Sequence, residues 1–139
     1  MKKIVIIVLF ISILGIVSVP AETWQEFIDR AQIMEKNFRD GINRGNQNTW
    51  SYDKWGGLLA TSYWLEDAYE DIYKNAPHLS QYERDIYRGL WQRRMTQSDD
   101  LKRLLDLSIT SNSARRSIAD WMDYWGKHLY EKGGTINFN

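Results

Sequence analysis

The segment YWLEDAYEDIY, residues 63–73, carries four carboxylates at Glu66, Asp67, Glu70 and Asp71. Carboxylates at this spacing could ligate a metal ion, act as acid and base on a glycosidic bond, or form a solvated helix face. The two like-charge pairs four residues apart destabilise a helix by about 0.2–0.5 kcal/mol each. We therefore expect arginines from another helix, a cation or solvent to compensate them.

On a helical wheel with about 100° per residue, these acids lie opposite an apolar stripe centred on Leu65. Tyr63 and Trp64 fall on the same outer side as the acids. A charge run of this kind is usually a solvated face, whereas aromatics beside charges resemble interface anchors. The candidate partner-binding surface on this helix consists of Tyr63, Trp64, Glu66, Asp67, Glu70 and Asp71.

Two enzymatic uses of these acids can be weighed from sequence. The di-metal carboxylate bundles use an E-x-x-H motif on two helices, and this sequence contains no such motif. A cell-wall glycan enzyme with Glu66 or Glu70 as general acid remains an alternative. That chemistry needs two carboxylates about 5–10 Å apart in a cleft, one of them with a raised pKa. Outward-facing acids on a single helix do not easily meet either condition, so we expect a protein that is not an enzyme.

Two histidines are present, and neither has a recognisable catalytic partner in the sequence. His78 falls in a loop, whereas His128 falls in the last expected helix. Met34 and His128 could serve as axial ligands of a non-covalent haem in a helical bundle, which is an analogy of architecture only. This weak haem site is the second alternative function, and otherwise no metal or cofactor is expected.

Two arginine pairs, Arg93-Arg94 and Arg115-Arg116, could bind a phosphate or a carboxylate. Arg115 and Arg116 lie in a first helical turn, where the helix dipole disfavours cations. This mismatch favours a specific role for the pair, and the simplest is an ion pair with the acidic face at residues 66–71. We therefore add both arginines to the candidate partner-binding residues.

The first 21 residues resemble a secretory signal peptide. Lys2 and Lys3 precede an apolar run over residues 4–19, and small residues at Val19 and Ala21 match a signal-peptidase site. The run is shorter than the ~20 residues of a spanning helix, so cleavage after Ala21 is expected and an uncleaved anchor is the alternative. We expect a periplasmic or secreted protein that contacts the membrane only through this segment if it stays uncleaved.

The remaining chain, residues 22–139, is long enough for one domain with a core, which we place at 22–134 before a flexible tail at 135–139. Without cysteine, packing alone must hold this domain. Sixteen basic and 18 acidic residues remain after residue 21, so nucleic-acid binding is not expected. Seven tryptophans and eight tyrosines predict an aromatic core, with a sugar-stacking surface as the alternative.

Helix starts are marked by capping signals. Thr23 with Glu26 and Ser80 with Glu83 form capping boxes, and Ser51 is a typical N-cap. Apolar residues follow each signal at steps of three and four, and a fourth stripe follows near residue 114.

Two features complicate the helices. Gly56 and Gly57 cost about 1 kcal/mol each in helix propensity, so we expect a packing reason for them. The helix that begins after Ser80 could continue for ~30 residues, but a break or kink near Gln97 is favoured. The predicted fold is all-α, an antiparallel four- to five-helix bundle.

Together these patterns indicate an exported, non-catalytic helical binding protein of a chaperone-like, inhibitor or immunity type. Its expected partner is another protein in the exported compartment. No motif selects among these types.

Overall fold

A computed structural model describes residues 22–131 and 135–138, so the predicted signal peptide lies outside the described residues. All elements in this part of the chain are helical, which confirms the all-α class. They are α2 (Trp24–Asn43), a short 3-10 helix η1 (Gln47–Thr49), α3 (Tyr52–Asn75), α4 (Gln81–Ser108) and α5 (Asn112–Glu131). Within the described residues, no helix combines the length and apolarity that crossing a membrane requires.

The predicted helix starts are confirmed. The Thr23 hydroxyl accepts a bond from the Glu26 amide at 3.1 Å, and the Ser80 hydroxyl accepts one from the Glu83 amide at 3.1 Å. Each glutamate in turn accepts a bond from the backbone amide of its cap residue. Ser51 caps α3 through the Lys54 amide. Local side-chain chemistry therefore sets the starts of α2, α3 and α4.

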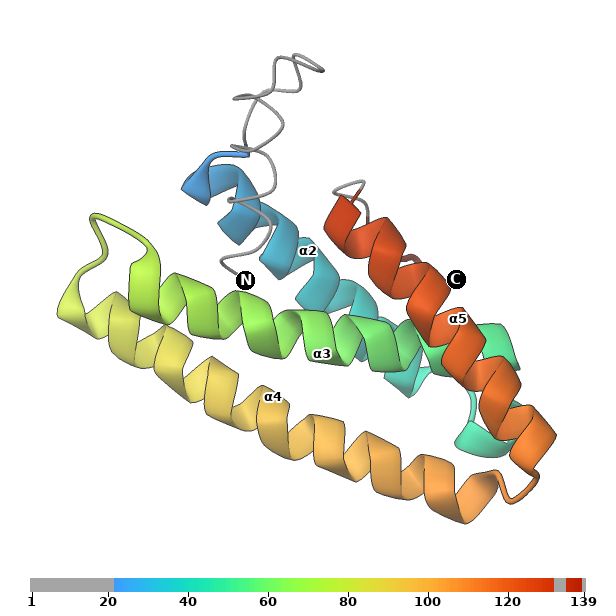
Figure 1. The fold of residues 1–139 in the computed structure, drawn as a ribbon. Helices are drawn as coiled ribbons and strands as arrows, with labels where there is room; N and C mark the ends of the chain where they lie inside the picture. Colours follow the sequence, from blue (N-terminus) through green and yellow to red (C-terminus); the bar gives the residue numbers. More distant parts are fainter. Residues whose placement is uncertain (1–21, 132–134, 139) are drawn as a thin grey trace, which may run out of the picture.

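The central element is α3, which packs against α2, α4 and α5. Figure 1 shows α3 and α4 side by side as an antiparallel hairpin, whereas α2 and α5 cross α3 obliquely. A helix in this position must be apolar on several sides. Its fully buried apolar side chains are Trp55, Leu58, Trp64, Leu65, Ala68 and Ile72.

The glycine pair has the packing role that we expected. A Cβ atom at Gly56 would lie 2.5 Å from the Trp121 Cβ and 2.7 Å from the Met122 backbone nitrogen. A Cβ at Gly57 would lie 2.8 Å from the Phe138 ring. Gly56 therefore lets the backbone of α5 approach α3 closely, and Gly57 leaves room for an aromatic ring.

The expected break near Gln97 is wrong, because α4 is one helix of 28 residues. Its buried positions Arg94, Ser98 and Leu101 follow at steps of four and three, so a single face continues through the suspected break. The Ser98 hydroxyl bonds to that of Ser62 in α3 at 2.5 Å. Ser98 therefore joins two helices instead of capping a new one.

Residues 135–138 pack against the helices, although the sequence predicted a flexible tail here. The Ile136 side chain is buried, and its carbonyl accepts a bond from Asn37 of α2 at 2.9 Å. The Phe138 ring lies over Gly41 and Gly57, as it would contact a Cβ at either position. A notch formed by two glycines on neighbouring helices thus receives the Phe138 ring.

Candidate functional site

The outer face predicted for residues 63–71 is partly inside the protein. Trp64 is fully buried, with its ring 5.6 Å from Phe27 of α2 and the Arg30 guanidinium 4.8 Å above it. Asp71 is only 3% exposed. The prediction that Trp64 and Asp71 face solvent is therefore wrong. The helical wheel assumed one buried stripe, whereas three helices surround α3.

The other acids of this face have partners within the fold. Asp67 accepts a bond from the Tyr130 hydroxyl of α5 at 3.2 Å, and Glu70 pairs with Lys74 at 3.3 Å. Tyr63 remains exposed. Much of the expected compensation for the acidic face therefore comes from α5 and from α3 itself.

The predicted ion pair between this face and the arginines of α5 is also wrong. Arg115 instead pairs with Asp106 of α4 at 2.7 Å, and Arg116 is exposed. The start of α5 follows the C-terminal end of α4 after a short connection. Its first turn therefore meets α4 and not the acidic end of α3.

The surroundings of Glu66 shift its pKa. Its carboxylate lies half-buried against α4, where it accepts a hydrogen bond from Ser98. Burial raises the pKa of Glu66 above the ordinary value of 4.5, and the Ser98 bond opposes part of this shift.

This shift predicts a pH dependence of stability. The folded protein holds the Glu66 proton more tightly than the unfolded chain does. The stabilisation of the fold that results is therefore fully present below pH 4.5 and is lost as the pH rises through the raised pKa of Glu66. Above that range, Glu66→Gln is expected to be at least as stable as the natural protein in urea unfolding. Glu83→Gln should show the opposite sign, since bonds from Ser80 lower the pKa of Glu83. A stability difference between the natural protein and Glu66→Gln that stays constant from about pH 4 to about pH 7 would rule this out.

The two weak haem candidates occupy different environments. Met34 is fully buried in the core. His128 is half-buried on α5, with its ring 5.6 Å from that of Trp125. A haem ligated by Met34 would have to displace packed core side chains. Across residues 22–131 and 135–138, no group of three or more histidines and acids is arranged to hold a metal ion.

The tryptophans divide between core and surface. Trp55 and Trp64 are fully buried, as an aromatic core requires. On α5, Trp121 and Tyr124 are 39% and 58% exposed, with the Trp121 ring stacked on Trp125 at 6.4 Å. The aromatic content therefore serves mainly the core, and α5 keeps a small exposed cluster.

The most distinctive concave surface lies between α2 and α4, with Tyr69 of α3 as its floor. It consists of two adjoining pockets of about 220 and 320 Å³, which share Gln32, Tyr69 and Leu90. We call the whole the α2–α4 groove. Its apolar half is lined by Ile28, Ala31, Ile86 and Tyr87, with Glu83 at the end. Its arginine half is lined by Glu35, Arg39, Arg93, Arg94 and Gln97.

The arginine half holds three guanidinium groups and one carboxylate, a net charge of +2. Glu35 is the shared acceptor. It forms an ion pair with Arg94, accepts a bond from the Tyr69 hydroxyl at 2.9 Å, and lies 3.8 Å from the Arg39 Nε. Burial and the neighbouring Glu35 raise the pKa of Tyr69, which keeps the phenol protonated.

Arg94 is buried but incompletely bonded. It is 2% exposed, and its guanidinium stacks 4.8 Å from the Phe38 ring. Among residues 22–131 and 135–138, the acceptor that Arg94 finds is Glu35, which bonds to Nη2. Within the described part of the chain, Nε and Nη1 of Arg94 and Oε1 of Gln97 have no hydrogen-bond partner. Such buried polar atoms cost about 1–3 kcal/mol each when left unsatisfied.

A second buried arginine shows the contrast. Arg30 is 7% exposed, and all three of its nitrogens are bonded. Nε and Nη2 each donate to Glu22 at 2.9 Å, and Nη1 donates to the Leu129 carbonyl at 3.0 Å. All three side-chain nitrogens of Arg30 thus donate to acceptors within the fold, whereas Arg94 can still donate to a further acceptor.

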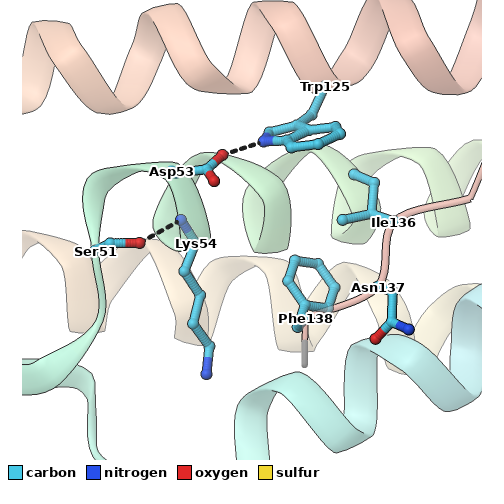
Figure 2. Close-up of a pocket in the computed structure, with 7 residues that line it drawn as sticks. All are labelled: Ser51, Asp53, Lys54, Trp125, Ile136, Asn137 and Phe138. Carbon is cyan, nitrogen blue, oxygen red and sulfur yellow. Dashed lines mark hydrogen bonds between the residues drawn. The ribbon is translucent and has the colours of Figure 1, made fainter.

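Another pocket, of about 220 Å³, lies where the C-terminal segment docks (Figure 2). Trp125 points into it and donates to Asp53 at 2.5 Å, while Lys54 donates to the Arg44 carbonyl at 3.0 Å. The charged groups of this pocket are therefore bonded within the chain. The α2–α4 groove is the better candidate site.

Sequence reasoning misses most of this groove. It identifies Arg93 and Arg94 as a pair that could bind an oxyanion, but it does not connect Glu35, Tyr69 or Gln97 with them. The one available signal is the four-residue step from Leu90 to Arg94, which places the arginine on the buried stripe of α4. Comparison of the chain with protein-family models, curated proteins and solved structures finds no match in any of the three.

Proposed function

We propose that this protein is an exported, non-catalytic binding protein that holds an anionic group of its ligand in the arginine half of the α2–α4 groove. The observation that supports this most is Arg94, a buried guanidinium with two nitrogens that lack an acceptor. Arginine binds carboxylates and phosphates through such charge-assisted hydrogen bonds. The signal-peptide pattern of residues 1–21 supports export.

An oxyanion in this half would accept a bond from Nη1 of Arg94 and leave the pair with Glu35 in place. Arg93 and Arg39 are more exposed and would add longer-range attraction, which salt screens. The Gln97 side chain could turn its amide toward the same oxygen. The net charge of +2 favours an anion over a neutral ligand.

The partner surface predicted from the sequence has weaker support. Two of its residues, Trp64 and Asp71, belong to the interior, and Asp67 and Glu70 are bonded within the fold. A protein partner in the exported compartment remains compatible with the groove if it presents an acidic side chain or a C-terminal carboxylate. The glycan-enzyme alternative is not favoured, because Glu66 and Glu70 do not line the groove.

The proposal is tested with inorganic phosphate and acetate as probes, titrated into ¹⁵N-labelled protein at low salt. We expect weak, saturable binding with chemical-shift changes centred on Arg93, Arg94 and Gln97. Arg93→Gln, at an exposed position, should weaken binding severalfold without unfolding the protein. Arg116→Gln removes an exposed charge on α5 and serves as the matched control. Shifts that never saturate, or that respond equally to both variants, would refute a specific anion site.

A further inference from the structure

We infer that the ligand of the α2–α4 groove is a single-chain amphiphile, an alkyl chain that ends in a carboxylate or phosphate. This inference rests on the proposed anion site and extends it along the groove. The apolar half adjoins the arginine half, because both are lined by Gln32, Tyr69 and Leu90. One molecule could therefore occupy both halves.

The apolar half is suited to an alkyl chain. Ala31 and Ile28 line it from α2, and Ile86, Tyr87 and Leu90 line it from α4. Ile86 is 44% exposed, so apolar surface remains in contact with water at this edge. An alkyl chain in the groove would cover that surface, and burial of apolar area is the main favourable contribution to such binding.

The charges at the two ends fix the orientation. The arginine half carries a net charge of +2, whereas the far end of the apolar half carries Glu83. Hydrogen bonds from Ser80 lower the pKa of Glu83, which keeps its carboxylate ionised. An anionic head group is therefore attracted to Arg94 and repelled from the Glu83 end. The alkyl chain of the ligand should then point toward the start of α4.

The length of the groove limits the length of the alkyl chain that it can hold. Its lining residues on α4 extend from Glu83 to Leu90 in the apolar half, and seven residues of helix span about 10 Å. An extended chain advances roughly 1.2 Å per bond, given about 3.5 Å for the three bonds of one residue. About eight methylenes thus fill the apolar half. A ligand of about eight to ten carbons fits best.

The experiment measures the affinity of the full chain for acetate, hexanoate, octanoate, decanoate and dodecanoate by calorimetry, below their micellar concentrations. Affinity should rise about two- to fourfold per added methylene and level off near decanoate. Decanol should bind at least about tenfold more weakly than decanoate, and decyltrimethylammonium more weakly still. Decyl phosphate and a single-chain phospholipid distinguish the source of the ligand. Tighter binding of decyl phosphate identifies a free alkyl acid, and tighter binding of the phospholipid identifies a membrane-derived lipid.

Two exposed positions on α4 give matched variants. Ile86→Ser should lower decanoate affinity severalfold and leave acetate affinity unchanged, whereas Leu107→Ser, at a 76% exposed leucine outside the groove, should change neither. If acetate binds but decanoate binds no tighter, the amphiphile is refuted and the anion site stands. If neither anion binds, both proposals fail. Equal affinity for decanol and decanoate would overturn the assignment of the head group to the arginines.

Discussion

Replacing Glu35 with alanine is expected to lower the free energy of unfolding by about 3–5 kcal/mol. The change leaves Arg94, which is 2% exposed, without the one acceptor that it has among the described residues. It also removes the acceptor of the Tyr69 hydroxyl. A buried charge without a partner is far more costly than the loss of a surface ion pair. Urea unfolding followed by circular dichroism measures the difference.

Two further variants separate this cause from a general effect of removing an acid from α2. Asp40→Ala breaks the exposed pair with Lys36 and should leave the stability almost unchanged. The double variant Glu35→Leu with Arg94→Met removes both charges and should recover most of the loss, because apolar replacement of a buried pair is often neutral. A Glu35→Ala loss below about 1 kcal/mol would mean that Arg94 is satisfied by another group.

The second large effect is expected at Gly56, where alanine should destabilise the protein by about 1–3 kcal/mol or more. In an unobstructed helix this change would gain about 1 kcal/mol. Here the added methyl would lie 2.5 Å from the Trp121 Cβ and 2.7 Å from the Met122 nitrogen. These are atoms of the α5 backbone or directly attached to it, so the whole helix must move. Thermal or urea unfolding gives the sign directly.

Two other glycines serve as comparisons for the stability change of Gly56→Ala. Gly57→Ala meets the Phe138 ring, which can rotate away, so its cost should be smaller. A methyl group at Gly89 meets no atom of the described residues within 4 Å, so Gly89→Ala should stabilise α4 by up to about 1 kcal/mol. If Gly56→Ala behaves like Gly89→Ala, α5 does not approach α3 as closely as the structure shows.

The local features of the fold could be predicted, because neighbouring residues determine them. The capping boxes at Thr23 and Ser80 place helix starts through contacts three residues apart. The orientation of α3 could not be predicted in the same way. A helical wheel shows one periodicity, and the acids beside Trp64 suggest an outer face there. Only the packing of α2 on that side of α3 reveals that Trp64 is core.

The groove was less predictable still. Glu35 and Arg94 are 59 positions apart, and nothing in the local sequence of either residue indicates the other. Arg93 and Arg94 are adjacent in sequence, which suggests a single surface pair. On a helix, neighbours point about 100° apart, so one guanidinium is buried while the other is exposed. Charge pairing across helices depends on tertiary placement.

The contacts between α2 and the C-terminal part of the chain have a consequence for the order of folding. The bonds from Arg30 to Leu129 and from Asn37 to Ile136 each join residues 99 positions apart, whereas Arg84 and Tyr73 are only 11 apart. Closing the longer loops costs about 2 kcal/mol more in chain entropy. A disulfide would remove that cost from the unfolded chain, but this chain has no cysteine. The α3–α4 hairpin can therefore form early, and the joining of the two ends of the domain comes late.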